Sequence, residues 1–539
     1  MSSKLFPALL IAGVQFVVCM SALSRQADPL ICESQGFPAF CFMTTSVPRM
    51  QFGDMSWGDF DADGDMDLVV SGNGGTPSSP IPILSFHRNE GEIAILGPPP
   101  APNLPPLVDY QTVYSPLEVE FVLHDGSTAI GDFDGDGKID AAVTGVDPDG
   151  GLVTAFWRNV SQELMGVELF ATHPGLRASS IAFGDADNDG DLDLALSGLD
   201  ENEVARLWIA ENEFLIPQGR TFTFRDTGLA GAAHGRLVWG DYDNDGDRDL
   251  LVSGNVDNQG VVRIYRNDGG NFVDAMANIR GALFANADWG DYDGDGDLDI
   301  VVAGGRLDPF VLRGLTRILR NDGGAYVEVA VLDGMFHGTA AWVDYDNDGD
   351  LDAFVSGGER VSGEVLGIFL ENTGSGFERS QILGGGLYGG AALADYDYDG
   401  DVDVMLFGTL STRVLFAQEY RNEIAQPNQG PSAPTGATAV VVGNSVELSW
   451  SASTDDHTPS AGLTYNVRIG PIPTANRMPS MSTPDGRRLV TARGNVDHSL
   501  SWTISGLEQG TWTWQVQAVD GSGVGSAFTA DQQFVVAPE

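Results

Sequence analysis

Seven aspartate-rich segments recur along the chain at nearly regular intervals. The first begins at Asp59 and has the sequence DFDADGDMD, and the others begin at Asp132, Asp185, Asp241, Asp291, Asp344 and Asp395. The spacings between successive segments are 73, 53, 56, 50, 53 and 51 residues. A period near 50 residues indicates a solenoid, a propeller or another array of similar units.

The sequence between the segments distinguishes among these arrays. Around the fourth segment, apolar residues 237–240 precede the aspartates, residues 250–254 follow them, and a second strand-like run at 262–267 ends in an Asp-Gly-Gly turn. About four strands in each repeat correspond to one propeller blade. The run after each segment is apolar on both faces, as in a strand pressed between neighbouring blades. We therefore expect an all-β fold with a seven-bladed β-propeller over residues 25–423.

Two irregularities affect how the ring of blades closes. The last repeat lacks a fourth strand, and residues 40–44 lie ahead of the first segment where the period places an outer strand. We predict that residues 40–44 complete the last blade, which removes an exposed sheet edge; the alternative is that they merely pack nearby. The first spacing is the longest, and residues 77–116 hold ten prolines. This stretch indicates a loop that extends from the first blade, either to contact a ligand or as a tolerated insertion.

The aspartate segments have the composition of cation sites. Each has aspartate at positions 1, 3, 5 and 9 and glycine at position 6, while position 7 is aspartate in six copies and Lys138 in the second. Carboxylates so close together repel one another unless a cation lies among them. Oxygen donors without His or Cys favour calcium or magnesium, and glycine permits the sharp turn around the ion. We expect up to seven structural Ca²⁺ ions, with position 7 contributing its backbone carbonyl.

The residues expected to hold the ions are Asp59, Asp61, Asp63, Asp65 and Asp67; Asp132, Asp134, Asp136, Lys138 and Asp140; Asp185, Asp187, Asp189, Asp191 and Asp193; Asp241, Asp243, Asp245, Asp247 and Asp249; Asp291, Asp293, Asp295, Asp297 and Asp299; Asp344, Asp346, Asp348, Asp350 and Asp352; and Asp395, Asp397, Asp399, Asp401 and Asp403. An EF-hand begins similarly but needs a glutamate at position 12 and flanking helices. Here position 12 is apolar in all seven copies, which excludes that module. Seven solvated acidic turns without metal are the remaining alternative.

These segments resemble the FG-GAP or VCBS repeats of integrin α-subunit head domains and many bacterial surface proteins. Phe183-Gly184-Asp185 carries the Phe-Gly pair that names the family, and the resemblance covers residues 38–423. It implies a seven-bladed propeller with calcium in the blade hairpins, bound by the side chains at positions 1, 3, 5 and 9. The chain lacks the membrane helix and inserted domain of an integrin, so integrin-style signalling is not implied.

The N-terminal residues have the pattern of an export signal. Lys4 is followed by an apolar stretch from Leu5 to about Val18, and residues 22–24 are a candidate cleavage site. A buried helix or a membrane anchor is the alternative, but the stretch is short for a span. We expect residues 1–24 to be removed and the protein to be secreted or to lie at the cell surface. In that compartment Cys32 and Cys41 can pair or stay as free thiols.

The C-terminal part differs in composition from the repeats. Residues 424–434 form a polar linker with three prolines, and residues 435–539 contain short strand-like runs separated by turn residues. This segment resembles a fibronectin type III domain, an immunoglobulin-like β-sandwich, and Trp450, Tyr465 and Leu507 match core positions of that family. Residues 471–498 are longer and less regular than the family pattern.

Charge and the absence of catalytic motifs limit the function. The chain has 76 acidic and 28 basic residues, a net charge of −48 that disfavours nucleic acid and anionic membranes. No Gly-x-Ser-x-Gly elbow or metalloprotease histidine pair occurs, and we interpret the seven scattered histidines as surface or packing residues: His87, His124, His173, His234, His337, His457 and His498. Trp157, Trp208 and Tyr388 belong either to a sugar site or to the core. We expect a binding protein for an extracellular protein or carbohydrate; the alternatives are a polysaccharide lyase or esterase, and a purely structural role.

Overall fold

The computed structural model describes residues 41–538 except 46, 77–78, 80, 97–107, 118–122, 162–165, 216–218, 309–310, 360–364, 411–413, 423, 425–427 and 473–480. Every regular element in these residues is a β-strand. The expected export signal and Cys32 lie outside the described residues. Within the described part, the chain forms no helix long and apolar enough to cross a membrane.

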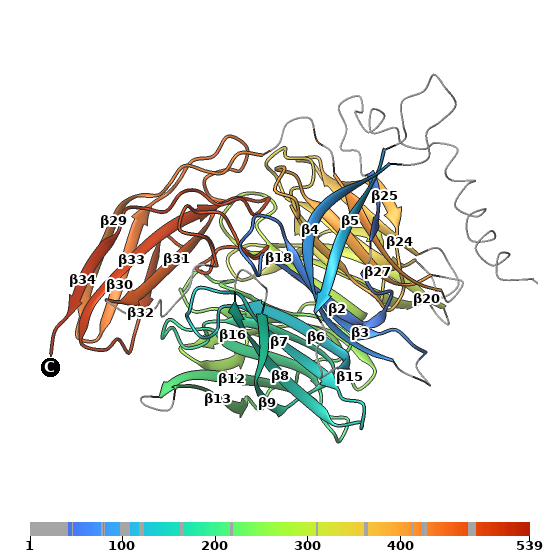
Figure 1. The fold of residues 1–539 in the computed structure, drawn as a ribbon, viewed down its shortest axis with the longest axis horizontal. Helices are drawn as coiled ribbons and strands as arrows, with labels where there is room; N and C mark the ends of the chain where they lie inside the picture. The colour runs from blue at the N-terminus through green and yellow to red at the C-terminus, as the bar shows by residue number, and fades with distance from the viewer. Residues whose placement is uncertain are drawn as a thin grey trace, which may run out of the picture.

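The described residues between 41 and 421 form seven four-stranded blades of a propeller, five of them separate sheets and two joined in one eight-stranded sheet (Figure 1). Blade 1 has β2 (Gln51–Gly58), β3 (Asp67–Asn73), β4 (Pro82–Leu96) and β5 (Val108–Leu117); blade 2 has β6 (His124–Gly131), β7 (Asp140–Val146), β8 (Leu152–Ser161) and β9 (Gly166–Pro174); blade 3 has β10 (Arg177–Gly184), β11 (Asp193–Leu199), β12 (Ala205–Leu215) and β13 (Gly219–Asp226); blade 4 has β14 (Leu237–Gly240), β15 (Asp249–Val256), β16 (Gln259–Asp268) and β17 (Asn271–Asp274). Blade 5 has β18 (Leu283–Gly290), β19 (Asp299–Asp308), β20 (Val311–Asn321) and β21 (Tyr326–Asp333); blade 6 has β22 (Ala340–Val343), β23 (Asp352–Gly358), β24 (Val365–Asn372) and β25 (Phe377–Gly384); blade 7 has β26 (Ala391–Ala394), β27 (Asp403–Thr409), β28 (Leu415–Arg421) and β1 (Cys41–Thr45).

The N-terminal strand closes the ring, as the sequence predicts. Strand β1 pairs antiparallel with β28, with Cys41 opposite Arg421 and Phe42 opposite Tyr420. It also pairs in parallel with β5 over two residues, so blades 1 and 7 share one continuous sheet. The two ends of the propeller segment are therefore held together by backbone hydrogen bonds, and blade 7 has no missing strand.

Apolar side chains fill the spaces between neighbouring blades. The second strands, such as β3 and β23, are buried along their whole length, which explains their lack of polar alternation. Each pair of adjacent blades has its own core cluster, as where Phe133 and Phe156 of blade 2 pack with Phe222 of blade 3. The long first spacing extends the β4–β5 hairpin of blade 1, in which β4 is a 15-residue strand.

The C-terminal residues form a β-sandwich of two three-stranded sheets, seen at the left of Figure 1. One sheet has β29 (Thr435–Val442), β30 (Ser445–Ser451) and β32 (Ser501–Ile504); the other has β31 (Thr464–Pro471), β33 (Gly510–Val519) and β34 (Gln532–Val536). Trp450, Tyr465 and Leu507 are buried in one core cluster between these sheets. This confirms the expected sandwich, while the resemblance to the fibronectin type III family stays a prediction.

Candidate metal centres and an axial cavity

Each aspartate segment is the loop that joins the first and second strands of its blade. In blade 1 the loop runs from Asp59, directly after β2, to Asp67, the first residue of β3. The glycine at position 6 has a left-handed backbone in all seven loops, with φ from 88° at Gly137 to 112° at Gly64. Only glycine adopts this conformation readily, so the predicted sharp turn is confirmed.

The loop backbone directs the carboxylates inward. In the sixth loop, Asp344 accepts hydrogen bonds from the N–H groups of Asp348 (3.2 Å) and Gly349 (3.1 Å). Ligand atoms of three aspartates lie within 4.8 Å of one another in the loops described: positions 1, 3 and 9 in the first and third loops, and positions 1, 3 and 5 in the second and fourth. Several oxygens can therefore reach one ion in each of these loops.

The aspartate at position 9 also has a structural part. Asp67 is fully buried and accepts hydrogen bonds from the backbone N–H of Asn89 and of Phe60, both at 2.8 Å. It thereby joins the third strand of the blade to the aspartate loop. Burial, together with repulsion from Asp61 and Asp59, raises the pKa of Asp67 to about 9. Sequence reasoning assigned this position to the metal alone.

The carboxylates at position 7 accept backbone hydrogen bonds that the sequence did not indicate. Asp247 accepts a hydrogen bond from the backbone N–H of Gly269 (2.7 Å), and Asp401 accepts one from Ile424 (2.7 Å). These N–H groups lie just after the third strand of the same blade. The side chain at position 7 therefore braces the neighbouring turn, and in the second loop Lys138 pairs with Asp136 instead.

The sixth loop gives the clearest test of whether the residues fit a cation. Three buried oxygens, Asp346 Oδ1, Asp350 Oδ1 and Asp352 Oδ2, have no hydrogen-bond partner among the described residues. Burial, followed by repulsion from Asp348, raises the pKa of Asp346 to about 6 and that of Asp350 to about 7. An all-oxygen donor set with unpaired buried atoms fits a hard divalent cation.

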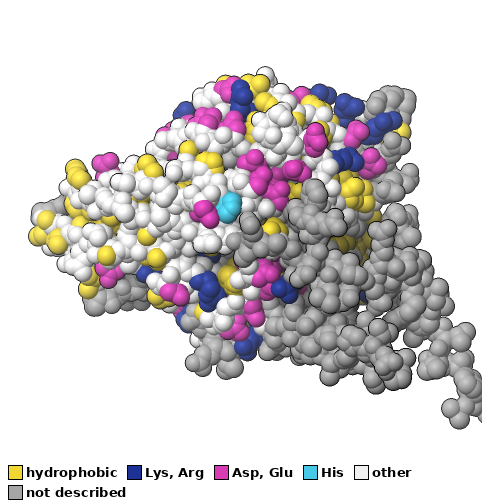
Figure 2. Space-filling model, turned by 90° about the horizontal axis from the view of Figure 1, so that it is seen from above, with side chains coloured by type: hydrophobic (Ala, Val, Ile, Leu, Met, Phe, Trp, Pro, Cys, Tyr) yellow, Lys and Arg dark blue, Asp and Glu magenta, His cyan; other side chains and the backbone are white. Residues whose placement is uncertain are grey.

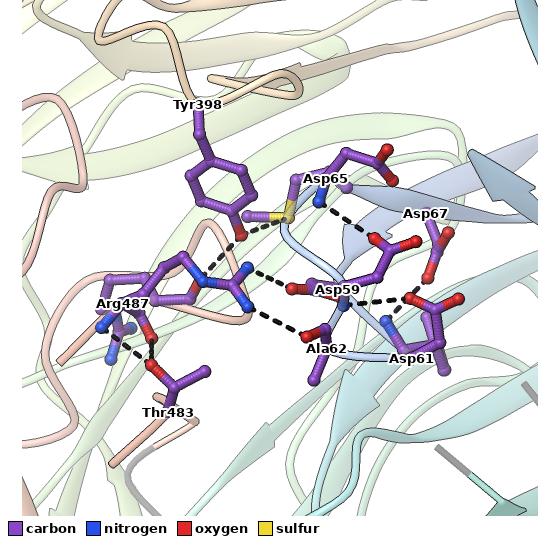
Figure 3. Close-up of polar contacts among 12 residues, drawn as sticks. Asp59, Asp61, Ala62, Asp65, Asp67, Tyr398, Thr483 and Arg487 are labelled. Carbon is purple, nitrogen blue, oxygen red and sulfur yellow. Dashed lines mark hydrogen bonds and ion pairs between the residues drawn. The ribbon is translucent and has the colours of Figure 1, made fainter. Parts of the chain in front are cut away.

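The first loop is different because arginines reach it. Figure 3 shows Arg487 of the C-terminal sandwich directed at Asp59, with its other terminal nitrogen 3.3 Å from the carbonyl oxygen of Ala62. The guanidinium also lies over the ring of Tyr398, 5.1 Å from the ring centre. Arg88 contacts Asp61 at 2.6 Å. Positive charge in this loop thus comes partly from the protein itself.

The sandwich and the linker lie against the propeller face that carries the aspartate loops. Asp497 of the sandwich is 2% exposed, pairs with Arg248 at 3.0 Å and accepts a hydrogen bond from the N–H of Asp241 (3.1 Å). Burial alone would raise the pKa of Asp497, but Arg248 and Arg493 hold it below its usual value. Contacts between the C-terminal part and the other loops join Met481 to Asp132, Trp502 to Asn188, Pro459 to Gly294, Ser522 to Asn347 and Asn428 to Gly400.

A cavity of about 350 Å³ opens on the propeller axis at the opposite end. Seven of its lining residues come one from each blade, and each lies seven positions before the first aspartate of its loop: Phe52, Asp125, Ala178, His234, Phe284, His337 and Tyr388. All seven have a left-handed backbone, with φ between 48° and 57°. Because the first strand of each blade runs between this ring and the aspartate loop, the two sites lie at opposite ends of the propeller.

Aromatic rings form a continuous arc around this cavity. The ring centres are 6.1 Å apart for His234 and Phe284, 3.6 Å for Phe284 and His337, 4.6 Å for His337 and Tyr388, and 4.9 Å for Tyr388 and Phe52. Burial and the proximity of His234 lower the pKa of His337 to about 3. The imidazole of His337 is therefore neutral at physiological pH.

The cavity changes the interpretation of the histidines for three of the seven, which are not scattered. His124, His234 and His337 come together on its wall. His234 and His337 lie seven positions before the first aspartate of their loops, and His124 lies eight positions before Asp132. Because the residue type at the ring position differs from blade to blade, a motif search does not find it. Of the three aromatic residues considered for a sugar site, Tyr388 lines the cavity. Trp157 is buried in the core between blades 1 and 2, and Trp208 packs against the core between blades 2 and 3.

Comparisons with known proteins were made for sequence and structure. The profile of the FG-GAP-like repeat family matches residues 132–196 and 241–302. No curated protein matches the chain.

The solved structures that are similar to the chain include two lectin or lyase structures and AofleA. The BP39L lectin from Burkholderia pseudomallei is 11% identical, with 71% of this chain and 98% of that chain covered and a TM-score of 0.46. The exotype rhamnogalacturonan lyase YesX is 13% identical, with 71% and 72% covered and a TM-score of 0.37. AofleA from Arthrobotrys oligospora is 14% identical, with 56% and 84% covered and a TM-score of 0.35.

Proposed function

Because the chain contains FG-GAP-like repeats folded into a β-propeller, we propose that it is a secreted or cell-surface calcium-binding protein that binds an extracellular protein or glycan. The binding face is the end of the propeller opposite the aspartate loops. One observation carries this assignment: the C-terminal sandwich and linker contact the aspartate-loop face, whereas the other end has an open cavity. The sandwich acts as a spacer or an adhesion module.

The aspartate loops have a structural part in this proposal. The side chains at positions 1, 3, 5 and 9 and the carbonyl at position 7 would hold Ca²⁺, which neutralises the crowded carboxylates when bound. The unpaired oxygens of Asp346, Asp350 and Asp352 support this assignment. The loops face the sandwich, so the ions stabilise the blade hairpins and the interface rather than contact a ligand.

A binding screen tests the proposal directly. The exported protein is incubated with an array of glycans and matrix proteins, once with calcium and once with chelator. We expect calcium-dependent binding to one class, because the metal keeps the propeller folded. Binding to no member of the array would contradict the binding function, and equal binding with chelator would contradict the calcium dependence.

An extracellular polysaccharide lyase or esterase is the second candidate. It is favoured by one contact on the cavity wall, where the Nδ1 atom of His124 lies 3.3 Å from a carboxylate oxygen of Asp125. Such a pair can act as a general base. Release of unsaturated sugars or acyl groups from array glycans would support this candidate, and intact glycans after prolonged incubation would exclude it for those substrates.

A further inference from the structure

We propose that the axial cavity binds the terminal residue of a neutral glycan, with the sugar ring stacked on the aromatic arc formed by His234, Phe284, His337, Tyr388 and Phe52. This inference rests on the proposed binding function and specifies its site and ligand class. Four properties of the cavity support this inference. They are its aromatic rings, its polar side chains that make no side-chain hydrogen bond with the described residues, the opposite charges of its lining residues, and its small volume.

The aromatic arc presents flat apolar surface to the cavity. Tyr388 remains 39% exposed although its ring lies between those of His337 and Phe52. Exposed aromatic faces that adjoin one another are uncommon unless they contact a ligand. The C–H groups on one face of a pyranose ring form a flat apolar surface of the same kind, so the two surfaces are complementary.

Polar side chains on the same wall lack hydrogen-bond partners. The imidazoles of His234 and His337, the amide of Asn286 and the hydroxyl of Tyr388 make no side-chain hydrogen bond with the described residues. Each of these neutral groups can both donate and accept. A sugar ring has several hydroxyl groups that also donate and accept. A quaternary ammonium ion would suit aromatic rings but would leave these polar groups unpaired, which disfavours it.

The charges around the cavity favour a neutral ligand over an acidic one. Among the described lining residues, Asp125 and Arg177 carry opposite charges, and Arg177 also forms an ion pair with Glu203. The lining therefore has no excess of positive charge to attract a carboxylate or a sulfate. The chain as a whole has a net charge of −48, and Figure 2 shows groups of acidic side chains on the propeller surface. A uronic acid or sulfated glycan would be repelled on approach.

The cavity is small and its rim is fixed by backbone hydrogen bonds between blades. The N–H of Tyr388 donates to the carbonyl of His337 (3.1 Å), and the N–H of His234 donates to that of Ala178 (2.8 Å). A volume of about 350 Å³ is at the lower end for ligand sites. It accommodates one or two sugar rings, which is why we assign the end of a glycan rather than a chain interior.

The test uses the full-length, calcium-loaded protein and three variants. The array carries neutral, sialylated and sulfated glycans, and the best neutral oligosaccharide is then titrated by calorimetry. His337→Asn and Tyr388→Asn each remove one ring of the arc, and asparagine tolerates the left-handed backbone at both positions. The control is His173→Asn, because His173 also stacks on a phenylalanine, Phe224 at 4.8 Å, but lies on β9 away from the cavity.

We expect neutral glycans to bind the wild type and His173→Asn equally, and the two arc variants to bind about tenfold or more weakly. Thermal melting of every variant confirms that the fold is kept. If the wild type binds a glycan or protein that the arc variants bind equally well, the cavity assignment is wrong while the binding function stands. Cavity-dependent binding of sulfated glycans, or of choline as a soluble cation, would overturn the ligand class.

Discussion

At the scale of single residues, the seven aspartate loops share a sequence but differ in the charges around them. Arg88 and Arg487 contact the first loop, and Arg421 contacts Asp397 of the seventh at 2.9 Å. In the sixth loop the corresponding neighbour is acidic: after burial and Asp348, Glu371 is a further cause of the raised pKa of Asp346. We infer that the sixth loop depends most on a bound cation and the first loop least.

Replacing Asp346 with asparagine tests this difference. Asparagine keeps the shape of the side chain but removes one negative charge from the loop, so the affinity for a divalent cation falls. We expect the purified variant to hold one calcium ion fewer than the wild type by elemental analysis. Asp322→Asn is the control, because Asp322 is an exposed aspartate paired with Arg320 outside the loops. An unchanged metal content in Asp346→Asn would argue against a cation in the sixth loop.

His337 makes stability depend on pH in a defined direction. Its pKa is lowered from 6.5 to about 3 by burial and by His234, and its other ring neighbours are Phe284, Phe336 and Tyr388. A lowered pKa means that the unfolded state binds the proton more tightly. The stability associated with neutral His337 is therefore present above pH 6.5 and is lost as the pH falls toward 3.

We expect His337→Asn to reduce the pH dependence of stability. Urea unfolding at several pH values should show that the wild type loses more stability than the variant between pH 6.5 and about 4. Other groups that titrate in this range contribute to both proteins and cancel in the difference. Parallel curves for the two proteins would contradict the assignment of a neutral, partly buried His337.

At the scale of elements, a buried asparagine near the end of the third strand joins each of blades 2 to 7 to the blade before it. The side chain of Asn321 donates a hydrogen bond to the carbonyl of Tyr242 in the preceding blade (3.0 Å), and its oxygen accepts one from the N–H of Gly324 (2.6 Å). Six such inter-blade bonds are present among the described residues, made by Asn159, Asn212, Asn267, Asn321, Asn372 and Asn422. These bonds fix the angle between successive blades at the aspartate-loop end.

Asn321→Ala measures the strength of one such link. The substitution removes both side-chain hydrogen bonds and leaves the carbonyl of Tyr242 unpaired in a buried place, so we expect a loss of about 1–3 kcal/mol in unfolding free energy. Chemical denaturation with calcium present provides the measurement. Asn271→Ala is the matched control, because Asn271 is exposed at the start of β17 in blade 4 and should change stability little. A loss that is equal in both variants would show that the buried link contributes nothing.

The elements that the sequence predicted are those with a local pattern. The aspartate loops, the apolar second strands and the strand predicted at residues 40–44 all follow from short runs or from their place in the period, and β1 at Cys41–Thr45 confirms the last of these. The role of the linking asparagines was not predicted, because a hydrogen bond to another blade produces no pattern within the sequence of one repeat. The cavity ring was missed because its seven members differ in type although they share one backbone conformation.

At the scale of the whole molecule, the C-terminal sandwich and the propeller form one unit. The segment at 471–498 was recognised in the sequence only as irregular. In the structure, its described residues 487–490 contact the propeller: Leu489 and Val490 enter the core between blades 1 and 2, and Arg487 contacts the first loop. Such contacts join residues more than 200 positions apart in the sequence, and neither periodicity nor a motif predicts them. The choice of binding face therefore had to come from the structure.

The interface should depend both on its buried ion pair and on the proposed calcium ions. Asp497 is 2% exposed and contacts Arg248 at 3.0 Å and Arg493 at 3.8 Å. Arg248→Ala removes the closer of these two cations. Leaving a buried charge short of its partner weakens docking by about 2–5 kcal/mol. We expect the linker at 424–434 to become sensitive to protease and the particle to lengthen in small-angle scattering.

The control for this variant is Arg266→Ala, since Arg266 forms an exposed pair with Asp268 on blade 4. Chelator should open the wild-type interface in the same way, because unneutralised loops repel one another and lose the shape that the sandwich contacts. An additive effect of chelator and Arg248→Ala would mean that the metal and the ion pair hold different parts of the interface. If the linker of Arg248→Ala stays as resistant as that of the wild type, with and without calcium, the two domains are held together by other contacts.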